Sequence, residues 1–271
     1  MTKREQKFVE IVWKYYKENG RHELPWRKTH DAYAILVSEM MLQQTQVDRV
    51  IPKYEAFLKK YPTALKLSKA SLADVLNLWQ GLGYNRRAKM LLLCSQMVMT
   101  HFKGVFPTSE LELLELPGVG PYTAKAILAF AYNTPSALIE TNVRSVYLYH
   151  FFKLKTDVTD AELLPYIERT CDRENPREWY YAVMDYGSYL KKEFGNPNAQ
   201  SKHYTKQSTF KGSDRQIRGA VVRALTIGSY TRTELLAVLS NYEDIRVDAQ
   251  VAKLIYEGLI EHKKKRYNLP R

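Results

Sequence analysis

The stretch LPGVGPYTA, from Leu116 to Ala124, lies between two segments that have the periodicity of helices. Gly118 and Gly120 allow backbone conformations that other residues avoid, and they let a ligand approach the chain closely. Pro121 suits the first position of a helix, where its missing N–H group costs nothing. The stretch therefore predicts two helices joined by a tight glycine hairpin.

The backbone N–H groups of this hairpin, together with the N-terminus of the helix that follows, can hold a phosphate group. Such a helix-hairpin-helix pattern holds a DNA backbone without reading its sequence. The candidate residues for this contact are Gly118, Val119, Gly120 and Thr123. A glycine-bearing turn between two helices, with no ligand, is the alternative interpretation.

Helical periodicity continues on both sides of the hairpin, and strand-like alternation is absent before residue 195. The connections are short and contain Gly, Pro or Asn, as turns between helices do. A mainly α-helical fold is therefore predicted. The segments expected to be helical in this part of the chain are Glu5–Glu18, Ala32–Gln44, Val47–Lys60, Ser71–Leu78, Arg86–Phe102, Ser109–Glu115, Tyr122–Tyr132, Asn142–Phe152, Asp160–Thr170 and Pro176–Phe194.

The sequence changes character after residue 194. Residues 195–213 contain three lysines and no acidic residue, and we expect a basic linker or a strap over the preceding domain. Three helical segments and two short strands around a basic turn follow, which predicts a winged helix-turn-helix domain at 214–271 after a domain at 1–194. The three helical segments are Asp214–Leu225, Thr231–Leu239 and Arg246–Tyr256. The basic turn Lys263–Arg266 is equally well interpreted as a wing tip or as a solvated charged turn.

The chain has a formal net charge of +12, from 41 Lys and Arg against 29 Asp and Glu. Surplus positive charge attracts polyanions and releases their counterions on binding, which favours a nucleic-acid partner without proving one. No apolar run reaches the ~18–20 residues that cross a membrane. The first residues also lack the apolar core of a secretory signal. A cytoplasmic protein is therefore expected, associated with the nucleoid if the source is prokaryotic.

The two cysteines, Cys94 and Cys171, lie far apart in apolar or helical surroundings. Buried free thiols are the simpler interpretation of both. A four-cysteine iron–sulfur site cannot be built from two cysteines within one chain. The sequence therefore predicts no iron–sulfur cluster, no bound metal and no other cofactor.

Two acidic residues lie inside otherwise apolar stretches on either side of the hairpin. Glu39 precedes it and Glu140 follows it by 20 residues. Acids in such surroundings are rarely fully buried unless they are paired or used in chemistry. A structural acid is the commoner explanation for either one alone, but a DNA-binding hairpin between them favours a catalytic pair.

Five strings, taken in order along the chain, resemble sequences of the helix-hairpin-helix (HhH-GPD) DNA glycosylase superfamily. Within it they are most similar to the MutY-type A/G-mismatch adenine glycosylases. They are SEMMLQQTQVDRVIPKY at 38–54, LWQGLGYNRRAKML at 78–91, LPGVGPYTAKAILAFAY at 116–132, ETNVRSV at 140–146 and MDYG at 184–187. The resemblance implies a two-lobed helical fold that binds double-stranded DNA containing a mismatch or lesion. It also implies that the target base is flipped into a pocket between the lobes.

The resemblance implies a role for each site residue. Glu39 matches the general acid that protonates the departing adenine, and a desolvated site would keep it neutral near pH 7. Glu140 matches the carboxylate that stabilises the oxocarbenium-like sugar cation, with Tyr122 supporting it and Asn142 helping to hold the carboxylates and water. The residues that match positions entering or lining the DNA stack are Gln43, Gln44 and Tyr84. Their alternative interpretation is as exposed helix and turn residues.

Two substitutions in the matched strings bear on activity. Tyr122 occupies the place where lyase-type relatives such as endonuclease III have a Schiff-base lysine, so we expect a monofunctional glycosylase without strong AP-lyase activity. Glu140 replaces the family's Asp, and a misplacement of about 1 Å can cost ~100-fold in rate. Either the pocket is reshaped around the longer arm, or the activity is weak or redirected, or Glu140 is only structural.

Two parts of the usual family pattern are missing. The iron–sulfur cysteines expected after MDYG are absent, and packing by Tyr189, Leu190 and Phe194 with the basic strap is expected to replace the cluster. Asp185 is expected to cap a helix or position the neighbouring lobe. We expect the unit at 214–271 to stand in place of the C-terminal domain that recognises 8-oxoguanine, and to hold duplex DNA or contact another protein.

These observations predict a monomeric DNA glycosylase of base excision repair, acting on adenine mispaired with 8-oxoguanine or guanine. Excision of a different damaged or deaminated base is the first alternative. A non-catalytic protein that binds mismatched or damaged DNA is the second.

Overall fold

The computed structural model describes residues 1–207 and 209–270. The chain forms two compact units, each built from separate stretches of the sequence. Unit 1 comprises Met1–Leu36, Pro107–Glu115 and Val119–Lys206. Unit 2 comprises Val37–Phe106, Leu116–Gly118 and the chain from Gln207 onward. The division at residues 194 and 213 stays a prediction.

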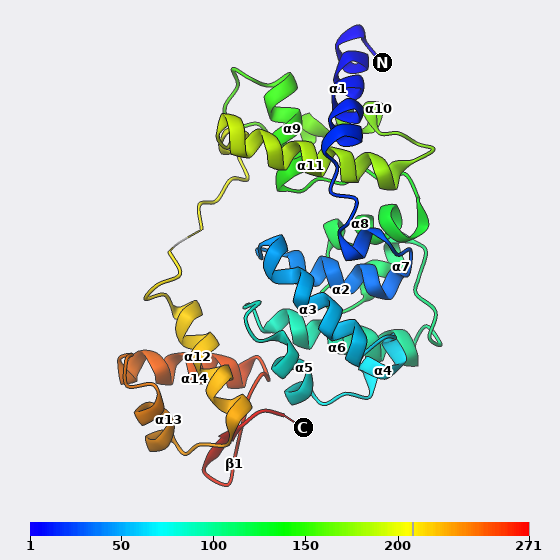
Figure 1. The fold of residues 1–271 in the computed structure, drawn as a ribbon. Coiled ribbons are helices and arrows are strands. Elements are labelled where there is room, and N and C mark those ends of the chain that lie inside the picture. The colour runs from blue at the N-terminus through cyan, green and yellow to red at the C-terminus, as the bar shows by residue number, and fades with distance from the viewer. Residues whose placement is uncertain (208, 271) are drawn as a thin grey trace. The chain divides into compact units, whose positions relative to one another are not determined.

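Unit 1 is organised around helix α11 (Pro176–Phe194), which packs against α1 (Lys3–Asn19) and α9 (Thr141–Phe151). Figure 1 shows α10 (Asp160–Thr170) near both of these helices, with which it also makes contact. Aromatic side chains fill the space between these helices, and burial of each aromatic ring removes a large apolar area from water. The remaining elements of unit 1 are η1 (Pro25–Arg27), the start of α2 (Ala32–Leu42), α7 (Glu110–Glu115), α8 (Pro121–Tyr132) and η2 (Pro197–Gln200).

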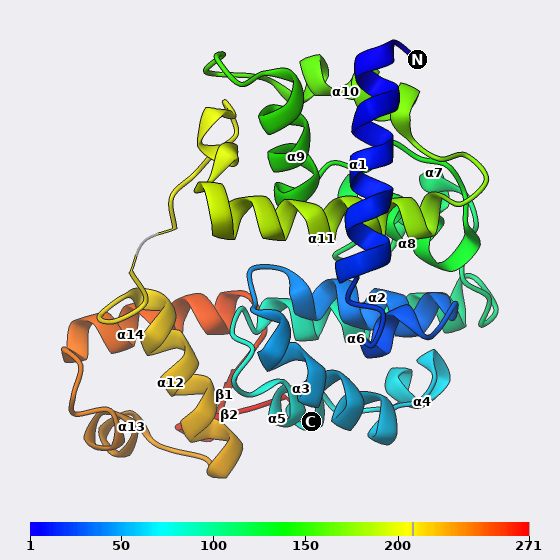
Figure 2. The ribbon, with the colours of Figure 1, turned by 45° about the horizontal axis from the view of Figure 1, so that its top comes forward.

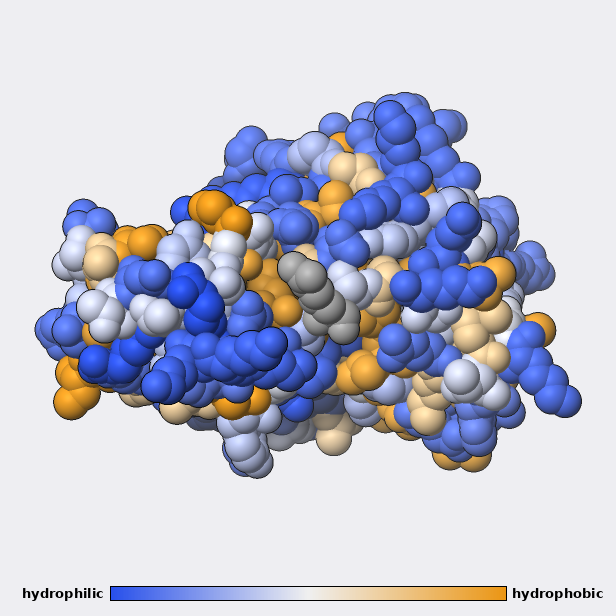
Figure 3. Space-filling view, turned by 90° about the horizontal axis from the view of Figure 1, so that it is seen from below, coloured by the Kyte–Doolittle hydropathy of each residue, from blue (hydrophilic) through white to orange (hydrophobic). Residues whose placement is uncertain are grey.

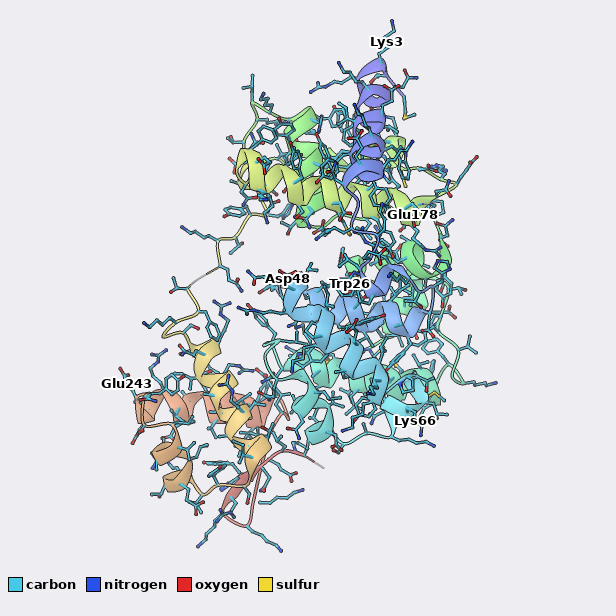
Figure 4. The ribbon with its side chains drawn as sticks, viewed as in Figure 1. Lys3, Trp26, Asp48, Lys66, Glu178 and Glu243 are labelled. Carbon is cyan, nitrogen blue, oxygen red and sulfur yellow. The ribbon has the colours of Figure 1, made fainter. Side chains whose placement is uncertain are left out.

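Polar contacts fix α1 at both ends within unit 1. Thr2 and Glu5 form a capping box at its start, and Glu5 also pairs with Arg169 of α10 at 2.7 Å. Near its end, the Tyr16 hydroxyl donates a hydrogen bond of 2.7 Å to Glu178. Glu178 lies in the first turn of α11 (Figure 4). The capping box at Thr2 and Glu5 satisfies backbone N–H groups that the start of a helix leaves without partners.

The first part of unit 2 is a group of helices around α6 (Arg86–Thr100), which packs on α4 (Ala64–Ser68) and α5 (Leu72–Trp79). Trp79 and Cys94 are fully buried in this core. The end of α2 and the helix α3 (Val47–Lys60) complete this part.

The C-terminal part of unit 2 has three helices and a two-stranded antiparallel hairpin. Its elements are α12 (Asp214–Ile227), α13 (Arg232–Val238), α14 (Asp244–Tyr256), β1 (Glu261–Lys263) and β2 (Arg266–Asn268). Figure 2 shows α12 crossing α14, with which it packs, and α12 also contacts α5. The Lys89 ammonium donates to the Glu257 carbonyl at 2.6 Å, and the Ala73 N–H donates to the Pro270 carbonyl at 3.1 Å.

The prediction of a mainly helical protein is confirmed, and each expected helix is present within a few residues of its predicted bounds. The capping box expected at Thr231 and Glu234 opens α13. The expected order of three helices and a hairpin, as in a winged helix-turn-helix, is also observed. The helix α4 was not predicted, because five residues are too few to show a helical period.

Within the described residues, no helix combines the length and the hydrophobicity that crossing a bilayer requires. Figure 3 shows one face of the molecule, on which hydrophilic residues predominate and hydrophobic ones form separated patches.

Candidate functional site

The glycine hairpin has the predicted form, but its two glycines differ. Gly118 has φ +79°, and a Cβ there would lie 2.5 Å from Met90 Cβ, so only glycine fits. Gly120 is the N-cap of α8 and has φ −96°, so it does not use the unusual backbone conformations that glycine allows. No described atom lies within 4 Å of a Cβ built at Gly120, which leaves its backbone open to a ligand.

The other two hairpin candidates, Val119 and Thr123, have buried side chains. Their contacts with a phosphate would therefore use backbone N–H groups, as the first turn of a helix does. The phosphate-binding role of all four hairpin residues stays a prediction.

Two of the residues expected at the DNA stack have left-handed backbones. Gln44, after α2, has φ +54°, and Tyr84, before α6, has φ +47°. Residues other than glycine rarely adopt this conformation, and where they do, it often serves a site. Both side chains belong to residues that are exposed to solvent.

Arg87 holds the two turns that contain Gln44 and Tyr84. Its buried guanidinium donates hydrogen bonds to the carbonyls of Met40 and Gln43, each at 2.6 Å, and of Leu82 at 3.1 Å. Burial lowers the pKa of Arg87 to about 10. The sequence analysis missed this residue, because an arginine in the first turn of a helix looks like an ordinary exposed cation.

A cavity of about 860 Å³ opens in unit 2 beside these turns. Its walls come from the α2–α3 turn, the α5–α6 turn and α12. Four of the predicted DNA-binding residues line it, namely Gln43, Gln44, Tyr84 and Gly118. The structure therefore brings these four residues to one place within unit 2.

Glu39 lies in α2, whose sequence AYAILVSEMML is almost entirely apolar. The residue is only 6% exposed, and its neighbours Met40 and Met41 are fully buried. Glu39 is therefore a buried acid in largely apolar surroundings. It belongs to unit 2, whereas the other three catalytic candidates belong to unit 1.

Glu140 is the N-cap of α9. Its Oε1 accepts hydrogen bonds from the backbone N–H groups of Asn142 at 2.7 Å and Val143 at 2.8 Å, and Asn142 Nδ2 lies 3.4 Å from its Oε2. Burial raises the pKa of Glu140, and the two backbone donors counteract part of the rise. The longer arm of Glu140 is thus fixed in place, and Asn142 is one of the groups that hold it.

The string MDYG lies in α11, and its Asp185 forms a buried ion pair within unit 1. Asp185 accepts hydrogen bonds from Arg27 Nη1 at 2.7 Å and from Arg21 Nε at 2.6 Å. Burial by itself would raise the pKa of Asp185, but Arg27 and Arg21 outweigh it and hold the pKa below its ordinary value. Asp185 lies in the middle of α11, so it does not cap that helix, and its role in positioning the neighbouring lobe stays a prediction.

Tyr122 lies in the first turn of α8 and is half-buried. Lys125, one turn further along, lies 4.0 Å from the carboxylate of Glu110 in α7. The Lys125 ammonium thus points toward α7.

The segment after MDYG offers aromatic side chains where an iron–sulfur cluster would need thiolates. The Tyr189 ring lies 4.9 Å from that of Tyr15 and 6.1 Å from that of Phe194, and Leu190 is buried. The segment at η2 is attached to unit 1 by hydrogen bonds between Val158 and the chain at 200–202. These residues do not fit a cluster. Among the residues that the structure describes, no group of three or more His, Cys, Asp or Glu could hold a metal ion.

The HhH-GPD superfamily base excision DNA repair protein family matches residues 37–208 of this chain. The chain therefore belongs to this superfamily, and the resemblance drawn from the five strings is confirmed. It is similar to the adenine DNA glycosylase of Mycobacterium tuberculosis (strain H37Rv), with 32% identity over 254 residues, covering 83% of this chain and 80% of the relative.

Two further relatives extend this comparison. The adenine DNA glycosylase of Buchnera aphidicola subsp. Baizongia pistaciae is 35% identical over 184 residues, which are 68% of this chain and 52% of the relative. This chain thus spans about half the length of that protein. The solved structure of a thermostable thymine-DNA glycosylase matches with a TM-score of 0.61 and 25% identity, over 69% of this chain and 87% of that one.

Proposed function

We propose that the protein is a monofunctional DNA glycosylase of base excision repair that removes adenine mispaired with 8-oxoguanine or guanine. The observation that best supports this function is the single buried carboxylate of Glu39 on an apolar helix, one turn before the cavity-lining Gln43. The adenine glycosylases among its relatives support adenine as the base.

In the proposed reaction the DNA hairpin and the residues of the cavity hold mismatched duplex DNA, and the target nucleotide is flipped out of the stack. Protonated Glu39 donates its proton to the departing adenine, which becomes a neutral leaving group. The ionised carboxylate of Glu140 stabilises the sugar cation until water adds to it, and Tyr122 and Asn142 support that carboxylate.

We further propose that the enzyme acts as a cytoplasmic monomer without a metal or an iron–sulfur cluster. Base release should then survive prolonged treatment with EDTA followed by desalting. Loss of activity that added metal restores would contradict this proposal. Strand cleavage without alkali should also stay weak, because Tyr122 occupies the place of the Schiff-base lysine and a tyrosine hydroxyl cannot form a Schiff base.

The decisive experiment incubates the protein with duplexes that contain A:8-oxoguanine, A:G, T:G or U:G, and then applies alkali to break the strand at abasic sites. Wild type should release adenine opposite 8-oxoguanine or guanine, and Glu39→Gln should lose nearly all release. Glu55→Gln, on an exposed residue of α3, is the matched control and should retain it. No release from any duplex, or equal release by wild type and Glu39→Gln, would refute the proposal.

Excision of another base is the second candidate, and two observations favour it. Glu140 replaces the family's Asp, and the fold is similar to that of a thymine-DNA glycosylase. Release from T:G or U:G in preference to both adenine duplexes would establish this alternative. Binding that discriminates mismatched from matched duplex, with no release of any base, would instead indicate a non-catalytic binding protein.

A further inference from the structure

One wall of the cavity in unit 2 comes from a part of the chain outside the family match. The match ends at residue 208, and α12 begins at Asp214. The opposite wall is formed by the turns that contain Gln44 and Tyr84. We call this cavity the α12 groove.

The charge of the α12 groove is strongly one-sided. The arginines that line it are Arg49, Arg86, Arg87, Arg215, Arg218 and Arg223. Glu257 is the only acidic residue among its described lining residues, and it pairs with Arg218 at 2.6 Å. A groove with one sign of charge raises the local concentration of the opposite sign, so the ligand is expected to be an anion.

Residues from the C-terminal segment contact the two left-handed residues directly. Gln207 Nε2 donates a hydrogen bond of 3.0 Å to Gln44 Oε1. Arg215 Nη1 donates one of 2.8 Å to the Tyr84 hydroxyl, and its guanidinium lies 5.9 Å from the centre of the Tyr84 ring. A cation and an exposed aromatic ring therefore lie side by side at the groove, which is the combination that binds a nucleic-acid strand.

Gly219 keeps the groove open along α12. Glycine lowers the stability of a helix interior, so a side chain would be the more stable choice here. A Cβ built at Gly219 would meet no described atom within 4 Å, and the residue lines the cavity. A ligand can thus approach the backbone of α12 closely at this position.

We propose that the α12 groove binds one strand of duplex DNA. Arg215 and Arg223 of α12 contact its phosphates, and a base of that strand lies against Tyr84. The C-terminal unit is then a second DNA-holding element, added to the hairpin. This inference rests on the proposed function only in taking DNA as the ligand, since binding can be measured without base release.

The test measures binding of a fluorescein-labelled A:G duplex by anisotropy at a series of salt concentrations. The protein has the Glu39→Gln substitution, which keeps the base in place. Each phosphate contact contributes about 0.9 to the slope of log affinity against log salt, so the Arg215→Ala/Arg223→Ala double variant should lower that slope by about 2. Arg232→Ala removes the same type of charge outside the groove, and should leave the slope unchanged.

Two further substitutions, neither of which removes an arginine, test the groove itself. Gly219→Leu should weaken binding about tenfold at fixed salt while the melting temperature stays the same or rises, because leucine favours a helix and meets open space. Glu257→Gln should strengthen binding, because it removes the one acid among the described lining residues and frees Arg218.

An unchanged salt slope in the double variant would overturn the proposal, and so would an equal loss of slope in Arg232→Ala. Wild-type affinity in folded Gly219→Leu would also overturn it. If wild type releases no base but the double variant has a smaller salt slope, the proposed activity is refuted and the proposal that the groove binds DNA is supported. If wild type releases adenine and the double variant keeps the wild-type salt slope, the groove proposal is refuted and the proposed activity is supported.

Discussion

A Cβ atom added to Gly187 would lie 2.4 Å from the carbonyl oxygen of Asn142. Real Cβ atoms do not approach a backbone oxygen this closely, so α11 and α9 pack with their backbones nearly touching at this point. The same end of α9 begins with Glu140. The glycine of the MDYG string therefore sets the position of the helix whose N-cap is the second catalytic candidate.

Gly187→Ala should lower the free energy of unfolding by about 1–3 kcal/mol, the usual cost of forcing an extra carbon into a packed interior. Urea unfolding followed by circular dichroism measures this change. Base release should fall as well, because α9 must shift. Gly219→Ala is the control, and it should leave stability unchanged or raise it, since its Cβ meets open space.

Asp185→Asn should destabilise unit 1 by about 3–5 kcal/mol, because it leaves the buried Arg27 without its carboxylate. The pKa of Asp185 is held below its ordinary value, so its contribution to stability is complete at neutral pH. That contribution should disappear as the pH falls below about 4, through the folded-state pKa.

Unfolding measured from pH 7 down to the acid limit of folding checks this expectation. Wild type should lose more stability than Asp185→Asn over the acid range. Asp48→Asn, on an exposed residue at the start of α3, serves as control and should keep the wild-type profile. If wild type and Asp185→Asn lost stability in parallel as the pH falls, the ion pair between Asp185 and Arg27 would contribute nothing to the free energy of unfolding.

Glu140→Asp tests whether the site is adapted to the longer arm. Aspartate is at least as good an N-cap, so stability should change by less than about 1 kcal/mol. The carboxylate would withdraw by one methylene, and single-turnover release of adenine should slow by about 100-fold. A rate equal to or above that of wild type would mean that the pocket is not shaped around Glu140.

Arg87→Lys should weaken DNA binding without removing any groove charge. Lysine cannot reach the carbonyls of Met40, Gln43 and Leu82 together, and each buried carbonyl left without a donor costs about 1–3 kcal/mol. The turns at Gln44 and Tyr84 should loosen. Anisotropy and thermal melting report the two effects, and Arg86→Lys, on the exposed neighbour, should change neither.

The sequence predicted the helices well because their apolar faces recur at the helical period, as in Asp160–Thr170 and Pro176–Phe194, whose bounds were predicted without error. It also predicted that Gly118 and Gly120 give the hairpin a backbone freedom that other residues lack, and Gly118 uses it, with a positive φ. Gly120 does not use this freedom, because it has an ordinary extended backbone.

The contacts that organise the candidate site were beyond the sequence. Glu140 is a helix N-cap, a position for which Ser, Thr, Asp and Asn are the usual signals. The contacts of Arg215 and Gln207 with Tyr84 join residues more than 120 positions apart, and no local period reports such a pairing. Sequence patterns describe faces of helices, whereas these contacts depend on where helices end and turns meet.

Gly118 of the hairpin is tightly packed on two sides. A Cβ at Gly118 would come within 3.0 Å of Met40 Cε as well as striking Met90, so the turn rests on α2 and on α6 at once. Met40 is the next residue after Glu39. In the proposed enzyme, the turn that contacts the DNA backbone would therefore rest directly on the helix that carries the acid, so a shift of one would displace the other.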